Sequence, residues 1–274
     1  MKNLATFKNE VCLIAGSGLF AYEAASFLNT KGSLKKIILL SKNNNIKKDF
    51  KKICFHYDIR DLEKIITDIK KENIKDVIII GYVDLPPIYE FKLSLKSKFY
   101  LSKDFFLNNI NHQSLILKRF LNNKNINLLS QKKIFKSFLI NKNDQLIKKE
   151  HKSIVIKVLN NLPYIKKIFN LNLAQSLIIN GNRVLAIEDF KGTNNLINRI
   201  DSNKSNYSEL TFIKSKKKEQ IDEIDFPVIG SETIDLLLAK KFKVICLFNY
   251  QTIISNKSIF LKKIKNSNIS LLVI

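Results

Sequence analysis

Short apolar runs alternate with amphipathic helical runs in the first third of the chain, and this alternation constrains the fold more than any other feature. The predicted strands cover residues 11–14, 37–40 and 77–80, and the predicted helices cover residues 20–28 and 61–71. In the second of these helices the apolar residues recur at helical spacing on one face. Strands that alternate with helices predict a parallel sheet, whose ligands bind at the carboxyl ends of the strands.

A glycine-rich turn follows the first predicted strand. Gly16, Ser17 and Gly18 lead into the helix, and with Ala21 the run reads G-x-G-x-x-A, which is close to the dinucleotide-binding fingerprint. Glycines at this place let backbone N–H groups approach a phosphate. The second strand, however, runs into Ser41 where that fingerprint has an acid to hold a ribose. The turn therefore predicts a phosphate site and disfavours NAD.

The first domain is expected to end in a polar stretch. The loop 81–87 lies at the carboxyl end of the third strand and is either a binding loop or a simple strand stop. Helical spacing continues over 104–129, and 131–150 is polar and rich in lysine. A boundary at this composition shift gives a Rossmann-like N-terminal domain, 1–135, and a C-terminal domain, 140–274.

The second half of the chain has a different order of elements. The predicted helices cover 154–168 (restarting at Pro163), 196–200 and 259–264, and the predicted strands cover 177–179, 184–187, 244–247 and 269–273. Asn180-Gly181 between the first two strands is a strong signal for a β-hairpin. The charged stretch 204–222 is expected to be a solvated loop or a ragged strand. Together these elements predict a second α/β domain.

A single acid opens the most distinctive turn of this half. Asp225 precedes Phe226-Pro227, and a proline disfavours helix at the residue before it. Ser231 is expected to cap the helix that follows, whose positive end would attract a phosphate or a metal-bound phosphate. Asp225 is therefore either a site residue on a rigid turn or merely the start of that turn.

The net charge of +23 comes almost entirely from lysine, with only four arginines. Specific readers of nucleic acid rely on arginine, which argues against a nucleic-acid partner. Lysine occurs here together with heavy use of Asn and Ile, as expected from an AT-rich genome, so most of the charge is interpreted as a solvated surface. What remains is a general attraction to anionic partners, including an acidic membrane face.

The chain has three cysteines and three histidines, which are Cys12, Cys54, Cys246, His56, His112 and His151. The cysteines show no paired metal spacing and are expected to be buried thiols in a reducing cytoplasm. The histidines are expected at the surface. No stretch reaches the ~18 apolar residues of a membrane span, and the N-terminus does not have the layout of a signal peptide.

Three groups of residues occur in a collinear order along almost the whole chain. They are 13–18 (LIAGSG), then Gln175, Gly181, 184–188 (VLAIE), Gly192 and Thr193, and then Gln220, 225–230 (DFPVIG), Thr233 and Ile234. This order and spacing resemble the LpxI family, the UDP-2,3-diacylglucosamine pyrophosphatases of bacterial lipid A synthesis.

The resemblance implies a C-terminal hydrolase domain and a divalent metal, usually Mg²⁺. The implied reaction converts UDP-2,3-diacylglucosamine to UMP and 2,3-diacylglucosamine 1-phosphate (lipid X), in the cytoplasm at the inner membrane face. Asp225 matches the essential acid of the family, and Asp225 and Glu188 are expected to be catalytic and to hold the metal. Carboxylates with completing waters suit Mg²⁺, although Glu188 alone also reads as a solvated strand end. Substrate contacts are expected from Gly16, Ser17, Gly18, Gln175, Gly192, Thr193 and Thr233.

Four positions depart from the family pattern. Lys191 and Asn194 stand where acids are expected, and Glu223 and Leu85 stand where arginines are expected. These departures leave open a catalytically decayed homologue that still binds nucleotide or lipid. The glycine turn, with Lys42 after the second strand, leaves open an NADP-dependent oxidoreductase. The sequence neither requires nor excludes a homodimer.

Overall fold

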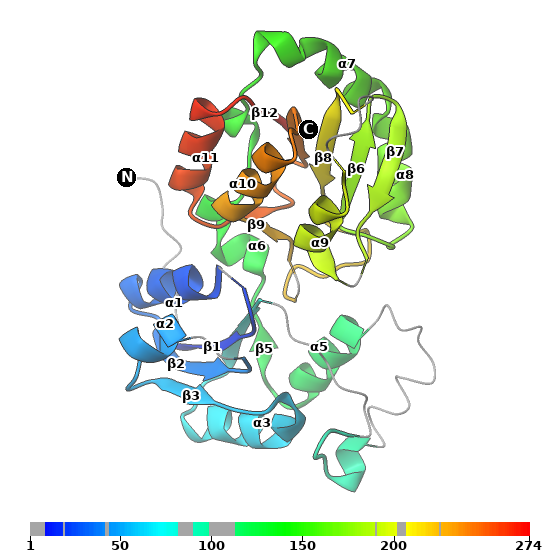
Figure 1. Cartoon of the computed structure of the whole chain (residues 1–274). Helices are drawn as coiled ribbons and strands as arrows, with labels where there is room; N and C mark the ends of the chain where they lie inside the picture. The colour runs from blue at the N-terminus through cyan, green and yellow to red at the C-terminus, as the bar shows by residue number, and fades with distance from the viewer. Residues whose placement is uncertain are drawn as a thin grey trace. The chain divides into compact units, whose positions relative to one another are not determined.

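The computed structural model describes residues 9–18, 20–41, 44–81, 90–98, 113–189, 191–201, 207–224 and 226–274. These residues form two compact units, shown in Figure 1. The first unit holds the described residues up to 134 together with 221–224, and the second holds 135–220 together with the residues from 226 onward. The ranges expected from the sequence do not include this return of the chain to the first unit.

The first unit is a parallel sheet covered by helices. Its strands are β1 (Val11–Ala15), β2 (Leu34–Leu39), β3 (Cys54–His56), β4 (Asp76–Ile80) and β5 (Asn127–Leu128), in the spatial order β3-β2-β1-β4-β5. Its helices are α1 (Phe20–Thr30), α2 (Asn44–Asp49), α3 (Leu62–Lys71), α5 (Gln113–Asn123) and α6 (Gln131–Ile134), with a 3₁₀ turn, η1 (Ile59–Asp61). All four strand pairs are parallel, so the expected Rossmann-like architecture is confirmed.

The helix α3 shows how the sequence pattern becomes packing. Its apolar residues Leu62, Ile65, Ile66 and Ile69 are all buried, in one core with residues of β1, β4 and α5. The helices α1 and α2 lie on the opposite side of the sheet (Figure 1). Burying one such side chain stabilises the fold by roughly 1.5–3 kcal/mol, so this face alone fixes the helix on the sheet.

The returning segment completes the core of the first unit. Ile221 and Ile224 pack against the cluster that α3 and α5 form on the sheet. The backbone N–H of Gln131 donates to the carbonyl of Asp222 at 2.8 Å, and its side-chain amide donates to the carbonyl of Ile79 at 2.8 Å. The buried Gln131 therefore ties the segment to the end of β4.

The second unit contains a mixed sheet with helices on both faces. Its strands are β6 (Ser176–Asn180), β7 (Arg183–Ile187), β8 (Leu210–Lys214), β10 (Val244–Leu247) and β12 (Ser270–Val273), in the order β12-β10-β8-β6-β7. The strands β9 (Val228–Ile229) and β11 (Ile253–Ile254) form a small separate sheet. Its helices are α7 (Lys152–Asn160), α8 (Leu162–Asn170), α9 (Gly192–Asn198), α10 (Ser231–Ala239) and α11 (Lys257–Asn266), with 3₁₀ turns η4 (Lys136–Phe138), η5 (Lys142–Asp144) and η6 (Lys149–His151).

Two apolar clusters fix the layers of this unit. Residues of α9, α10 and α11 pack on one face of the sheet, and residues of α7 and α8 pack on the other (Figure 1). The predicted hairpin is present as β6 and β7, with Gly181 at φ +57 in the turn. The predicted restart at Pro163 is also present, because this residue lies in the first turn of α8. The expected second α/β domain is thus confirmed.

Several sequence expectations are wrong. The stretch 204–222 is not one solvated loop where the structure describes it. The alternative of a strand holds at β8, but this strand is buried in the middle of the sheet, because Leu210, Phe212 and Ile213 all enter the core. Of the expected helix 104–129, residues 104–112 lie outside the described part of the chain. The end of this range is not helical, since residues 127–128 form the strand β5, which pairs with β4.

Two local expectations also fail. The N-cap of α10 is Gly230, with no side-chain cap bond, so Ser231 is the first helical residue and not the cap. His151 is buried rather than at the surface, since it closes the turn η6 against β12 with its Nδ1 3.0 Å from Oγ of Ser270. His56 is exposed as expected, and His112 lies outside the described residues.

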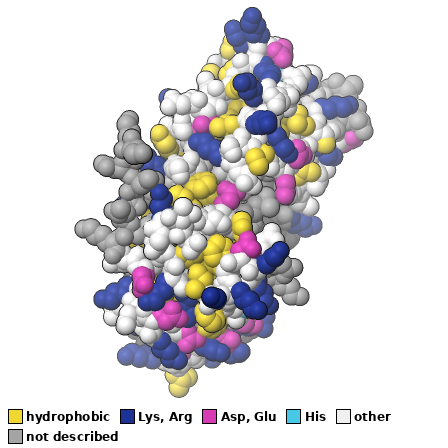
Figure 2. Space-filling model, turned by 90° about the vertical axis from the view of Figure 1, so that its left-hand side faces the viewer, with side chains coloured by type: hydrophobic (Ala, Val, Ile, Leu, Met, Phe, Trp, Pro, Cys, Tyr) yellow, Lys and Arg dark blue, Asp and Glu magenta, His cyan; other side chains and the backbone are white. Residues whose placement is uncertain are grey.

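Lysine and arginine side chains are spread over the molecular surface. Figure 2 shows them scattered over one face with acidic side chains among them, as expected for solvated charge. No helix among the described residues is long and apolar enough to cross a membrane. Cys12 and Cys246 are buried as expected, and burial raises the pKa of both thiols, whereas Cys54 is partly exposed.

Candidate functional site

A hydrogen-bonded polar cluster lies in the second unit, where the neighbouring strands β6, β7 and β8 begin or end at the same side of the sheet. The ammonium group of Lys214 donates to the hydroxyl oxygens of Ser176, at 3.0 Å, and Thr193, at 2.9 Å. The hydroxyl of Thr193 in turn donates to Oε1 of Glu188 at 2.7 Å. We refer to these four residues as the Lys214 cluster. It brings together two residues that the sequence nominated, Glu188 and Thr193, and two that it did not.

The sheet topology explains why these residues meet. Ser176 opens β6 and Lys214 ends β8, and the two residues are directly paired in the antiparallel ladder. Glu188 follows the end of β7, and its N–H donates to the carbonyl of Ser176 at 2.9 Å. Thr193 lies in the first turn of α9, which packs on the sheet through Leu196. Three strands and one helix therefore fix the cluster.

The burial of this cluster is unusual for such polar groups. Lys214 is 2% exposed and Ser176 is 0% exposed. A buried ammonium is costly unless hydrogen bonds compensate for its lost hydration, and the two hydroxyl groups provide such bonds. A charge kept in this environment interacts more strongly with a nearby anion than a surface lysine would. The cluster is therefore suited to attract phosphate.

Glu188 has a second carboxylate oxygen that remains without a hydrogen-bond partner. This atom, Oε2, is buried and has no partner among the described residues. A buried carboxylate oxygen needs compensation, and a divalent cation with an oxygen-rich shell would supply it. The donor therefore fits Mg²⁺ in kind. No group of three or more His, Cys, Asp or Glu side chains able to hold a metal occurs among the described residues.

The loop between β7 and α9 is held by an ion pair. Asp189 lies 3.1 Å from the guanidinium of Arg199 and also accepts the N–H of Lys191 at 2.9 Å. A second nitrogen of Arg199 donates to the carbonyl of Ile187 at 3.0 Å. Lys191 and Asn194, the two departures from the family pattern in this loop, are both exposed.

The remaining predicted residues of the second unit lie on neighbouring elements. Gln175 immediately precedes β6, and its carbonyl accepts the N–H of Ser215 at 2.9 Å. Gly192 begins α9 at φ +81, a conformation that favours glycine. Thr233 lies in the first turn of α10 and is 7% exposed. Gln175 and Gly192 therefore adjoin members of the Lys214 cluster, whereas Thr233 is on a separate helix.

The glycine turn of the first unit lies at the point where the strand order reverses. β1 continues into Gly16-Ser17-Gly18 and lies between β2 and β4, so the turn is at the crevice where such sheets bind ligands. Gly81, at φ +85, ends β4, and a Cβ at this position would lie 2.3 Å from the carbonyl oxygen of Ser17. Only glycine permits this close approach of the two strand ends.

Two further observations concern the edges of this crevice. Ser41, which follows β2, has a buried hydroxyl without a hydrogen-bond partner among the described residues. Glu223, which stands where the family pattern has arginine, forms an ion pair of 3.1 Å with Lys118 of α5. This departure is therefore compensated within the first unit.

Three residues that matter to the sequence hypotheses lie outside the described residues. They are Asp225, Leu85 and Lys42. The role of Asp225 therefore stays a prediction from the sequence.

Sequence analysis missed Lys214 and Ser176. With 47 lysine and arginine residues in the chain, one more lysine carries no signal by itself. The available signal was the short apolar run Leu210–Ile213, which ends in this lysine and reads as a strand once its charged flanks are set aside.

Comparison with known protein families agrees with both units. The model of the LpxI N-terminal domain matches residues 10–138, and the model of the LpxI C-terminal domain matches residues 142–272. A comparison with curated proteins finds no match to the chain. Because the two family models together span nearly the whole sequence in the expected order, the chain belongs to the LpxI family.

Proposed function

We propose that this protein hydrolyses the pyrophosphate of UDP-2,3-diacylglucosamine, releasing UMP and 2,3-diacylglucosamine 1-phosphate. The family gives the substrate class, lipid A precursors carrying UDP. The Lys214 cluster is the observation that supports this proposal most directly, because it joins a buried cation to a carboxylate with an unpartnered oxygen.

The chemistry of the reaction matches these groups. Water attacks one phosphorus atom, the bridging P–O bond breaks, and the leaving phosphate takes the electron pair of that bond. Negative charge grows on the phosphate oxygens, so a fixed and largely dehydrated cation lowers the barrier. We assign this role to Lys214. Thr193 and Ser176 hold its ammonium group in place.

Two carboxylates complete the proposed machinery. Asp225 acts as the base that takes a proton from the attacking water, and Glu188 supplies a hard oxygen ligand. We propose that Glu188 and Asp225 hold Mg²⁺, which when bound would neutralise phosphate charge. Glu188 contributes through the oxygen that its bond with Thr193 leaves unused.

We propose that the glycine turn Gly16-Ser17-Gly18 binds a phosphate group through backbone N–H groups. Residue 81 has no side chain, which lets the backbone after β4 lie against Ser17 in this turn. Ser41 replaces the acid that would hold a ribose in a dinucleotide enzyme, which argues against the oxidoreductase alternative.

Three of the four departures from the family pattern are compatible with activity, and the fourth, Leu85, lies outside the described residues. Lys191 and Asn194 are exposed, and Glu223 has a partner in Lys118. None of these changes removes a member of the Lys214 cluster. We therefore propose an active enzyme and not a decayed binder.

The decisive experiment measures UMP release from UDP-2,3-diacylglucosamine by the purified protein with Mg²⁺. Asp225→Asn should lower turnover by at least ~10²–10⁴ while the protein still binds substrate, since a general base alone contributes this much. The thermal midpoint should stay at the parent value, because the side chain keeps its size. Asp235→Asn, at an exposed acid of α10, is the matched control and should retain parent activity.

The outcomes separate the alternatives. Substrate binding by the folded parent without UMP release would mean a decayed homologue, and saturable NADPH binding would favour an oxidoreductase. Parent-like turnover of Asp225→Asn would show that another group is the base.

A further inference from the structure

An apolar surface lies along α8 and the edge strand β7. We define the α8–β7 face by five residues, Tyr164, Ile168, Leu171, Val184 and Ile187. Tyr164 is 67% exposed, Leu171 64% and Val184 46%. Tyr164 and Ile168 of α8 and Leu171, which caps its C-terminus, recur at spacing i, i+4 and i+7, so they follow one side of the helix to its end. Val184 and Ile187 pair with Ile179 and Leu177 of the α8 side of the sheet, which directs them to the same face.

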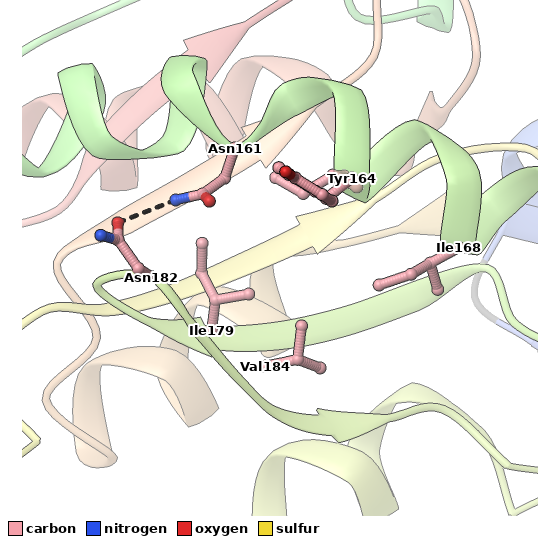
Figure 3. A pocket seen from close by; sticks show the side chains of 7 residues that line it. Asn161, Tyr164, Ile168, Ile179, Asn182 and Val184 are labelled. Atoms are coloured by element: carbon pink, nitrogen blue, oxygen red, sulfur yellow. Dashed lines mark hydrogen bonds between the residues drawn. The ribbon is translucent and has the colours of Figure 1, made fainter.

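A groove runs through this face between α8 and the hairpin. It has a volume of about 310 Å³, and Figure 3 shows Tyr164 and Ile168 facing Ile179 and Val184 across it. A hydrogen bond of 2.9 Å between the amides of Asn161 and Asn182 borders one end. Apart from these two amides and the tyrosine hydroxyl, the groups that line the groove are apolar.

Basic side chains accompany the apolar ones. Lys166 and Lys167 of α8 and Arg183 at the start of β7 are all exposed. The ammonium of Lys167 lies 5.7 Å from the centroid of the Tyr164 ring, so cation and aromatic ring are presented together. The sequence contains no Asp or Glu from 151 to 187, in a chain that otherwise carries 24 acids.

Acidic groups border this region. Glu188 and Asp189 directly follow Ile187, and Asp189 pairs with Arg199. Glu209 pairs with Lys157 of α7, and the backbone N–H of Glu219 donates to Asn172, just beyond α8. None of these acids pairs with Lys166 or Lys167 in these contacts. The face is therefore apolar along its centre, and exposed cations lie beside it on α8 and at the start of β7.

We infer that the α8–β7 face binds the surface of an anionic lipid bilayer. The exposed tyrosine and aliphatic side chains would enter the zone between headgroups and acyl chains, as the apolar side of an interfacial helix does. The lysines would extend their ammonium groups to the lipid phosphates while their stems remain on the apolar surface. The groove gives these side chains room to adjust on contact.

The charge pattern favours a bilayer over a second copy of the chain. A two-fold symmetric interface would place the same patch against itself. Lys166, Lys167 and Arg183 would then face their own copies without acids from this stretch to offset them. A bilayer that contains acidic lipids offers opposite charge and an apolar interior together.

This inference concerns a surface other than the Lys214 cluster and does not depend on turnover. Its test uses vesicles of phosphatidylglycerol and phosphatidylcholine in equal parts, and vesicles of phosphatidylcholine alone. Co-sedimentation of the full-length protein should occur with the acidic vesicles and should weaken as salt is added. Each basic residue at such a surface contributes about fivefold in affinity, so Lys166→Gln with Lys167→Gln should weaken binding by about 25-fold.

A second variant, Tyr164→Ser with Leu171→Ser, removes the apolar contribution and should weaken binding at least about tenfold. The matched controls lie on α11, where Lys262→Gln with Lys265→Gln and the half-exposed Ile259→Ser should bind as the parent does. Thermal midpoints and UMP release from substrate in detergent micelles verify that the variants remain folded and active.

Three results would overturn the inference. They are no binding of the parent to acidic vesicles, an equal loss in the α11 controls, or a parent dimer in solution that the Tyr164/Leu171 variant converts to monomer. Loss of vesicle binding with unchanged UMP release would support the surface and leave the proposed reaction intact, and the reverse result would contradict only the reaction.

Discussion

Two buried lysines, one in each unit, lie in different polar surroundings. Lys36 of β2 is 5% exposed and forms an ion pair with Glu72, with the Phe55 ring 4.7 Å from its ammonium group. Lys214 of β8 is 2% exposed and reaches the carboxylate of Glu188 through the hydroxyl of Thr193.

The difference shows how to separate structural from chemical charges. In a direct ion pair the two charges largely cancel each other's electrostatic field, so the pair attracts a charged ligand only weakly. The surroundings of Lys214 instead include, through Thr193, the carboxylate of Glu188, whose second oxygen has no partner among the described residues and could take part in binding a ligand. We therefore expect Lys36 to stabilise the first unit and Lys214 to act on substrate.

The largest expected effect is the loss of turnover in Lys214→Met. Removing a fixed donor to developing charge lowers turnover by about 10²–10³-fold. The free energy of unfolding should fall by about 1–3 kcal/mol, since the hydroxyl groups of Ser176 and Thr193 lose their buried donor. Steady-state kinetics and denaturant unfolding on one preparation check both quantities. Parent-like turnover in a folded variant would remove the distinction between the two lysines.

Lys36→Met should lower stability without lowering turnover. This change leaves Glu72 without its partner, and because that side chain is 35% exposed we expect a loss of roughly 2 kcal/mol, below the 3–5 kcal/mol of a fully buried pair. Turnover per folded molecule should not change. Lys35→Met removes an exposed pair with Glu10 next to it and should cost at most about 1 kcal/mol. A change in turnover at Lys36 with unchanged stability would contradict our assignment.

The smallest expected effect is a change in the pH dependence of stability caused by His151, a buried imidazole that stays neutral in the folded protein at neutral pH. Burial lowers its pKa below the usual value near 6.5, and nearby Lys243 and Lys148 lower it further against the opposing effect of Glu150. The unfolded chain therefore binds this proton more readily than the folded chain. Stability should fall as the pH drops below about 6.5 toward the lower folded value.

His151→Gln should flatten this slope in urea unfolding measured over the same pH range. His56→Gln, at an exposed histidine, is the control. An unchanged slope in His151→Gln would assign the pH dependence to other groups.

The sequence predicted those features whose cause is local. The face of α3 follows from apolar spacing, and the hairpin of β6 and β7 follows from its turn residues. The glycine turn could be recognised because the need for a close backbone approach restricts the residue type. In these cases the sequence pattern and the tertiary contact require the same residues.

Features that depend on distant contacts could not be predicted. β8 has five residues between charged flanks, and only its neighbours β6 and β10 make it a central strand. Lys214 becomes distinctive only through its burial. His151 is buried because Ser270, far along the chain, lies beside it. Local composition contains none of this information.

The return of residues 221–224 to the first unit has a consequence for synthesis on the ribosome. The last strand of that unit, β5, is complete at residue 128, but Ile221 and Ile224 of its core are added about 90 residues later. At ~5–20 residues per second the delay is roughly 5–20 s. During this interval Gln131 cannot form its bond with Asp222, and the apolar surface meant for the two isoleucines stays uncovered. The emerging N-terminal half is then the form of this protein most exposed to chaperones and proteases.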